Sequence, residues 1–262
     1  MIIIGERINA SRPAIQKAIE ESDEALIQKE ARSQAERGAQ YLDINCGLSR
    51  DKEERDMVWL VSAVRKVCDI PLCIDSPNSA AIEKGVAAAG ANCLINSITL
   101  EESRYKKIIP IALRYKCGII ALTMDSRGMP NTAAERAGLA EQMYKIMKAE
   151  GLSDEKIFFD PLVRPIASEP GQAKELLLSI PLIKRLGDVK VICGVSNVSY
   201  GLPKRKLINS IFLSLAIAAG LDGAITDPTD ESALGAILGA EAIMGKDKYC
   251  MNLIKSHRKG LI

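Results

Sequence analysis

Short apolar runs alternate with amphipathic stretches along the whole chain. We predict strands at residues 1–4, 40–45, 71–75, 92–96, 118–124, 156–160, 189–195 and 223–226. Between them, apolar residues recur at helical spacing, for example in residues 56–68, 102–115 and 136–151. Nearly continuous apolar strands need helices on both faces of a parallel sheet. The repeated strand–helix unit therefore predicts an α/β fold, a single (β/α)₈ TIM-barrel domain over residues 1–262. No G-x-G-x-x-G motif follows the first run, which argues against a Rossmann fold.

Polar residues stand at the end of each predicted strand. They are Glu6 and Asn9, Asp43 and Asn45, Asp75, Asn96, Asp125 (which follows Met124), Asp160, Ser196 and Asn197, and Asp227. Any one of them could be a turn former or a helix cap. Because the carboxyl ends of barrel strands meet at one rim, the set together predicts a cup rich in hydrogen-bond acceptors, with few cations.

Charge and composition restrict the partners. The chain has 35 basic and 33 acidic residues, without a basic stripe, and 4% aromatic residues. This favours a small molecule or another protein over nucleic acid. The first apolar run is too short for a signal peptide or a membrane span, so we expect a soluble, cytoplasmic protein.

Histidine and cysteine usage excludes several chemistries. The single histidine, His257, lies in a basic tail and is expected in solvent, which excludes Ser/His and Cys/His catalysis and argues against a Cys/His zinc site. The seven cysteines form no C-x-x-C pair, and we expect them to be reduced core residues.

Two ligands suit such a cup. A divalent ion on Asp43, Asp75 and Asp160 is one possibility. A heterocycle rich in N–H donors is favoured, because a buried Asp accepts two parallel hydrogen bonds from an amidine-like edge, while Asn offers a donor and an acceptor to a lactam edge. A pterin presents both edges.

Seven motifs, in this order, carry a family resemblance: IIIGERIN, LDINCG, LCIDS, LINSI, LTMDSRGMP, FFDPLV and GVSNVSYGLPKRKLIN. Over nearly the whole chain they resemble the pterin-binding barrels, most closely the methyltetrahydrofolate:corrinoid protein methyltransferases. The resemblance implies an enzyme that moves a methyl group between N5 of tetrahydrofolate and the cobalt of a corrinoid protein. The direction stays open. The methyl group would pass from methyltetrahydrofolate to a Co(I) corrinoid iron–sulfur protein, as in acetyl-CoA synthesis, or from a methyl-Co(III) protein to tetrahydrofolate, as in demethylation of betaine, amines or aryl ethers.

The resemblance also implies roles for individual residues. Asp75, Asn96 and Asp160 would hold the pterin, Asn197 would reach N5 as the catalytic residue, and Arg205 would contact folate and the partner. Weaker or supporting positions are Glu6, Asp43, Asn45, Met124 and Ser196. Tyr200 occupies the position of a corrinoid contact, where the family carries glutamine.

Alternatives remain at this point. A dihydropteroate synthase relative would show a basic phosphate-binding loop and a late Arg-x-His motif, neither of which occurs here. A folate carrier without catalysis and a zinc-dependent corrinoid methyltransferase are further alternatives, although no metal, and in particular no zinc, is expected. The family also implies a transient corrinoid-protein partner and a homodimer, for which the apolar residues 231–245 and 250–257 are candidate surfaces. No nucleic-acid or membrane partner is expected.

Overall fold

Eight parallel strands close into a barrel in the computed structural model, which describes residues 1–47 and 52–262. The strands are β1 (Ile2–Asn9), β2 (Tyr41–Asn45), β3 (Leu72–Asp75), β4 (Leu94–Ile98), β5 (Gly118–Leu122), β6 (Ile157–Asp160), β7 (Lys190–Gly194) and β8 (Gly223–Thr226). Their order in the barrel follows the chain, and β8 pairs with β1. The predicted (β/α)₈ fold is confirmed.

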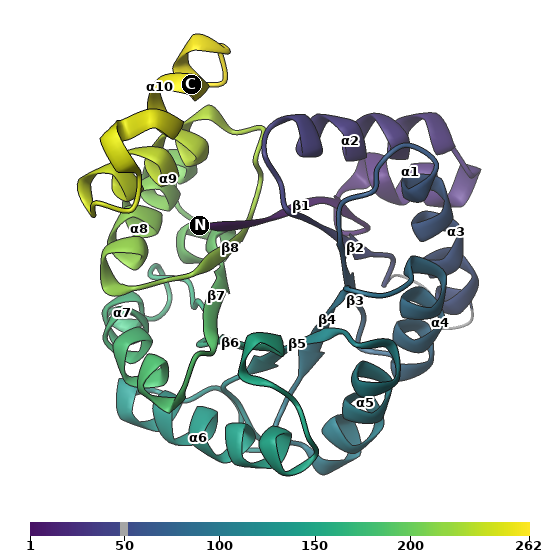
Figure 1. Ribbon diagram of the computed structural model, residues 1–262, viewed down its shortest axis with the longest axis horizontal. Coiled ribbons are helices and arrows are strands. Elements are labelled where there is room, and N and C mark those ends of the chain that lie inside the picture. The colour runs from purple at the N-terminus through teal and green to yellow at the C-terminus, as the bar shows by residue number, and fades with distance from the viewer. Residues whose placement is uncertain (48–51) are drawn as a thin grey trace.

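Helices form a ring outside the strands (Figure 1). They are α1 (Pro13–Glu21), α2 (Glu24–Glu36), α3 (Glu53–Arg65), α4 (Ser79–Ala89), α5 (Glu102–Tyr115), α6 (Ala133–Ala149), α7 (Gln172–Ile183), α8 (Arg205–Ala219), α9 (Glu231–Ile243) and α10 (Met251–Arg258). Short 3₁₀ turns are η1 (Asp154–Lys156), η2 (Lys184–Leu186), η3 (Val195–Ser199) and η4 (Lys248–Cys250). Among the described helices, none is long and apolar enough to cross a membrane.

The apolar residues form two layers. The larger cluster fills the space between strands and helices. A separate inner cluster consists of Ile4, Cys73, Leu94, Ile120, Phe158 and Ile192. Since strand side chains alternate between faces, the residue two positions later points to the same interior. On β1, β3, β4 and β6 that residue is Glu6, Asp75, Asn96 and Asp160. The barrel interior is therefore an apolar floor with polar groups above it.

Strand β1 is longer than predicted and contains a bulge. Its pairing with β2 shifts between Gly5 and Ile8, so that β1 has one extra residue there. Ile4 belongs to the inner cluster, whereas Ile8 belongs to the outer one. The bulge allows Glu6 to point inward like Ile4 and still brings Asn9 level with Asn45 of β2.

The structure corrects some of the other expectations and confirms others. Strand β5 ends at Leu122, before Met124, and β7 ends at Gly194, so that Ser196 and Asn197 lie in η3. Six cysteines are buried as expected, but Cys250 is exposed. Most apolar side chains of α9 cover the barrel, including Ala233, Leu234, Ile237 and Leu238. As expected, His257 is exposed; it lies on α10.

Candidate active site

Polar residues on four neighbouring strands stand at one level of the barrel. Asn9 on β1 is paired in register with Asn45 on β2, Asn45 with Asp75 on β3, and Asp75 with Asn96 on β4. In-register neighbours of a parallel sheet project to the same side. The sequence-predicted residues Asn45, Asp75 and Asn96 therefore form a continuous polar row on one wall of the barrel mouth.

Asp75 is a half-buried carboxylate with two stabilising neighbours. Burial raises the pKa of Asp75, whereas the Asn45 hydrogen bond and the charge of Arg104 act in the opposite direction. The Asn45 side-chain amide donates to Asp75 Oδ2 over 2.7 Å. Arg104, on α5, also donates to the backbone carbonyls of Ser76, Pro77 and Ser97. The sequence-based expectation of few rim cations was wrong, because the long Arg104 side chain reaches the rim from a helix.

Asp43 supports the row from one step deeper in the barrel. Its side chain is 2% exposed, and Asn96 Nδ2 donates to Asp43 Oδ1 over 3.4 Å. Burial raises the pKa of Asp43 well above its ordinary value, and the nearby Asp75 carboxyl raises it further. Two such close carboxyl groups disfavour a second negative charge. Asp43 thus fixes the Asn96 amide while adding little charge.

Asp160 ends β6 on another part of the mouth. Its Oδ1 accepts the backbone N–H of Leu162 over 2.8 Å. Burial raises the pKa of Asp160 to about 6, although the backbone N–H groups of Leu162 and Gly194 lower it. The carboxyl group therefore changes its charge close to neutral pH.

Asn197 is presented to solvent by a braced turn. The Arg205 side chain, at the start of α8, donates to Ser199 Oγ over 3.1 Å and to the Ser196 carbonyl over 2.7 Å. Both acceptors belong to η3, which carries Asn197. Asn197 itself is exposed, and its side chain has no hydrogen-bond partner within residues 1–47 and 52–262. The following Tyr200 is 67% exposed.

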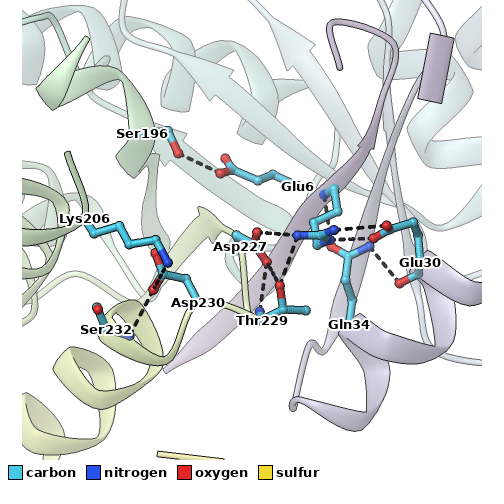
Figure 2. A network of polar contacts seen from close by, with 10 residues as sticks. Glu6, Glu30, Gln34, Ser196, Lys206, Asp227, Thr229, Asp230 and Ser232 are labelled. Atoms are coloured by element: carbon cyan, nitrogen blue, oxygen red, sulfur yellow. Dashed lines mark hydrogen bonds and ion pairs between the residues drawn. The ribbon is translucent and has the colours of Figure 1, made fainter. Parts of the chain in front are cut away.

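Glu6 and Asn197 line the same cavity. Its volume is about 500 Å³, and its other walls include Asn9, Arg12, Ser196, Arg205, Lys206, Asn209, Asp227 and Asp230. Ser196 Oγ donates to Glu6 Oε1 over 2.6 Å, as Figure 2 shows. Burial raises the pKa of Glu6, the Ser196 hydrogen bond lowers it and the Asp227 charge raises it.

A polar network missing from the sequence prediction secures this side of the barrel (Figure 2). Arg7, at the β1 bulge, binds both carboxylate oxygens of Glu30 on α2 and donates to Asp227 Oδ2 over 2.8 Å and Thr229 Oγ1 over 3.1 Å. The backbone N–H of Arg7 donates to buried Gln34 over 3.0 Å. The network fixes the strand that presents Glu6. The GERIN motif does not show which helix the arginine reaches.

The remaining predicted positions are less connected. Met124 is half-buried, and its backbone bonds to Leu122 and Leu100. Asp125 instead pairs with the exposed Arg127 over 2.7 Å. Among the residues that the structure describes, no group of three or more His, Cys, Asp or Glu side chains could hold a metal ion.

Comparison with known proteins places this geometry in a family. The family described as pterin binding enzyme matches residues 5–227. This chain is a member of the pterin-binding enzyme family. A methylcorrinoid:tetrahydrofolate methyltransferase of Eubacterium limosum is 34% identical over 265 residues, covering 100% of this chain and 98% of that protein. The resemblance to the corrinoid-dependent methyltransferases of this family is thereby confirmed.

Other pterin-binding enzyme relatives are more partial or more distant. Methionine synthase of Mycobacterium tuberculosis is 30% identical over 239 residues, which cover 86% of this chain but 20% of that protein. Among solved structures, dihydropteroate synthase of Xanthomonas albilineans with 4-aminobenzoic acid has a TM-score of 0.74 at 19% identity, covering 94% of this chain and 92% of that one. Dihydropteroate synthase of Thermus thermophilus has a TM-score of 0.64 at 17% identity, with 93% of each chain covered. These structures support the shared barrel fold.

Asp160→Asn should change how stability depends on pH. The pKa of Asp160 rises from 3.8 in the unfolded chain to about 6 in the folded protein, because burial favours the protonated carboxyl group. The contribution of this group to stability is therefore complete below pH 3.8 and is lost as the pH rises through about 6. Relative to wild type, the variant should therefore gain unfolding free energy on the order of 2 kcal/mol between about pH 4 and about pH 8. Urea unfolding across this range measures the difference.

Asp69→Asn is the matched control, because Asp69 is exposed. Its unfolding free energy should follow that of wild type at every pH. Parallel curves for Asp160→Asn and wild type would contradict the raised pKa of Asp160.

Proposed function

We propose that this protein transfers a methyl group from a methylated corrinoid protein to N5 of tetrahydrofolate. The observation that carries the proposal is the level row Asn45, Asp75 and Asn96 above an apolar floor, in a chain similar over its full length to a methylcorrinoid:tetrahydrofolate methyltransferase. The name of that relative favours this direction over transfer to a corrinoid iron–sulfur protein. Both tetrahydrofolate and the methylated corrinoid protein are substrates in this proposal.

The polar row suits the pterin ring chemically. A carboxylate such as Asp75 accepts two parallel hydrogen bonds from the 2-amino and ring N–H groups, and Asp160 provides further acceptors. Asn96 can donate to a ring oxygen or nitrogen and accept from a ring N–H. The apolar inner cluster below the row would contact the flat ring and exclude water from these bonds.

Asn197 suits the reacting nitrogen. N5 needs a free electron pair to attack the methyl carbon, so a cationic partner at this position would hinder the reaction. The oxygen of the neutral Asn197 amide can accept a hydrogen bond from N5–H. The electron pair of N5 then remains directed toward the corrinoid. Arg205 positions η3 through Ser196 and Ser199. We propose that exposed Tyr200 contacts the corrinoid, the role implied for this position by the family.

The alternatives have weaker support. The dihydropteroate synthase structures are 17–19% identical in sequence to this chain and support the barrel fold alone. A folate carrier would bind tetrahydrofolate without demethylating the corrinoid. Zinc chemistry is not part of the proposal, since the proposed steps use hydrogen bonds and the cobalt of the substrate.

We also propose a cytoplasmic homodimer that contacts its corrinoid protein transiently. The candidate surface is α8 rather than α9. Leu207, Ile211 and Leu215 lie four residues apart on α8 and are 59%, 53% and 52% exposed, while the opposite side of α8 packs on the barrel. When an outer helix has apolar residues on its exposed side as well as on its buried side, the exposed side is a candidate interface with another subunit.

Asp75→Ala should abolish tetrahydrofolate binding measured by isothermal titration calorimetry. The substitution removes the carboxylate that would accept hydrogen bonds from the N–H groups of the bound pterin. Each polar group left buried without a partner costs about 1–3 kcal/mol of binding free energy, more when it is charged. Asp69→Ala is the control, because this exposed aspartate lies outside the polar row. Tetrahydrofolate binding by Asp75→Ala with wild-type affinity would contradict the pocket assignment.

Asn197→Ala should lower the rate of methyl transfer by about 10²–10³, by analogy with the loss of one preorganised hydrogen-bond partner. Because Asn197 is exposed and its side chain is unpaired in the described part of the chain, the unfolding free energy should change by less than about 0.5 kcal/mol. Spectrophotometry of the corrinoid gives the rate, and exposed Asn252 replaced by alanine is the control. A wild-type rate in Asn197→Ala would exclude its catalytic role.

Ile211→Glu should convert the proposed dimer into a monomer in light scattering, because it buries a charge in an apolar interface. The control is Leu113→Glu, a comparably exposed apolar position on α5. A wild type that is monomeric at micromolar concentration, or an Ile211→Glu variant that stays dimeric, would refute this surface.

A further inference from the structure

Transfer of a methyl group to tetrahydrofolate releases a proton that the polar row does not accept by itself. N5 is a secondary amine. Its electron pair forms the new N–C bond, the C–Co bond breaks, and its electron pair stays on cobalt, which becomes Co(I). As the N–C bond forms, N5 gains positive charge, and passing its hydrogen to a base as a proton in the same step leaves a neutral tertiary amine. A nearby base must take this proton, and an amide such as that of Asn197 is too weak a base to keep it.

We infer that Glu6 is the base that accepts the N5 proton, directly or through one water molecule in the cavity beside Asn197. This inference rests on the proposed function and on its direction. In the reverse direction, protonated Glu6 would return the proton to N5, so that one residue serves both directions.

The cavity places Glu6 where a proton acceptor is needed. Glu6 and Asn197 line the same space of about 500 Å³, and Ser196, which precedes Asn197 in η3, donates to Glu6 Oε1 over 2.6 Å. This hydrogen bond directs the Glu6 carboxyl group toward the turn that carries Asn197 (Figure 2). In the described part of the chain, the second carboxylate oxygen, Oε2, has no hydrogen-bond partner. It is available to the substrate.

The other acids of the mouth are less suited to this task. Asp43 is 2% exposed and is bonded to Asn96, so it has little access to a ligand. Asp75 is bonded to Asn45 and would receive the pterin N–H groups. Asp160 already accepts the backbone N–H of Leu162. None of these three acids is among the residues that line the cavity with Asn197.

The surroundings of Glu6 also suit a proton acceptor. Burial raises the pKa of Glu6, which increases its strength as a base near neutral pH. The facing groups oppose one another: Ser196, Arg12 and Arg205 lower this pKa, whereas Asp227 raises it. Asp43 faces Glu6 from β2, and Lys206 and Asp230 line the same cavity.

The structure holds Glu6 in place independently of the substrate. Its neighbour Arg7 is anchored to Glu30 on α2 and to Asp227 after β8, while buried Gln34 accepts the Arg7 backbone N–H. At the β1 bulge the two neighbouring side chains point in different directions: Glu6 lines the cavity, whereas Arg7 reaches Glu30 on α2. A base held this firmly needs little rearrangement during the reaction.

The test compares wild type with Glu6→Gln in single-turnover methyl transfer from a methyl-Co(III) corrinoid protein to tetrahydrofolate, followed as Co(I) formation over a range of pH. In wild type the rate should fall toward acid pH, because protonated Glu6 cannot accept a proton. Glu6→Gln should react about 10²-fold more slowly or worse and should lose this acid limb. Its tetrahydrofolate affinity, measured by calorimetry, should stay within a few fold of wild type. Glu150→Gln, at the exposed end of α6, is the matched control.

Ser196→Ala provides a second measurement, the pH of the acid limb. This pH would not change if Glu6 had a purely structural role. Loss of the Ser196 hydrogen bond raises the pKa of Glu6, so the acid limb should shift to higher pH. A Glu6→Gln variant with the wild-type rate and acid limb would overturn the inference while leaving the methyltransferase proposal intact. A Glu6→Gln variant that loses tetrahydrofolate binding would also overturn it, by assigning Glu6 to binding. Wild type that forms no Co(I) would refute the proposed function itself, and the inference with it.

Discussion

The register of the closed barrel is the constraint on which the site depends. Parallel pairing holds Asn9, Asn45, Asp75 and Asn96 at one level of four adjacent strands, and the twofold alternation of side chains turns them toward the interior. The apolar cluster one step deeper excludes water from below. A shift of one residue in any of these strands would turn the polar group into the outer apolar layer, where its burial would be costly. Fold and site are therefore specified by the same pairing.

Burial and hydrogen bonding then give the acids different properties. Asp43 is buried among other polar groups and fixes Asn96, Asp75 is stabilised by Asn45 and Arg104, and Asp160 titrates near neutral pH. Glu6 lies apart from them, on the cavity shared with Asn197. The division separates acids that would hold the ring from the acid that would accept a proton, which is a common way for an active site to assign different roles to similar side chains.

Strand positions and the polar character of the rim could be predicted from the sequence, because both follow from local periodicity. The roles of Asp75, Asn96, Asp160 and Asn197 came from a family resemblance, since the residues alone favoured a donor-rich heterocycle but still allowed a metal site. Arg104 and Arg7 could not be predicted. Each reaches its partners from a distant segment, and no local pattern encodes the β1 bulge that directs Glu6 and Arg7 to different sides.

The most direct test of the account is the reaction itself. Wild-type protein mixed with tetrahydrofolate and a methyl-Co(III) corrinoid protein should convert the cobalt spectrum to that of Co(I) and form an equal amount of 5-methyltetrahydrofolate. The conversion should need all three components. Tetrahydrofolate binding without any change in the cobalt spectrum, across a panel of methylated corrinoid proteins, would contradict the account and indicate a folate-binding protein without this activity.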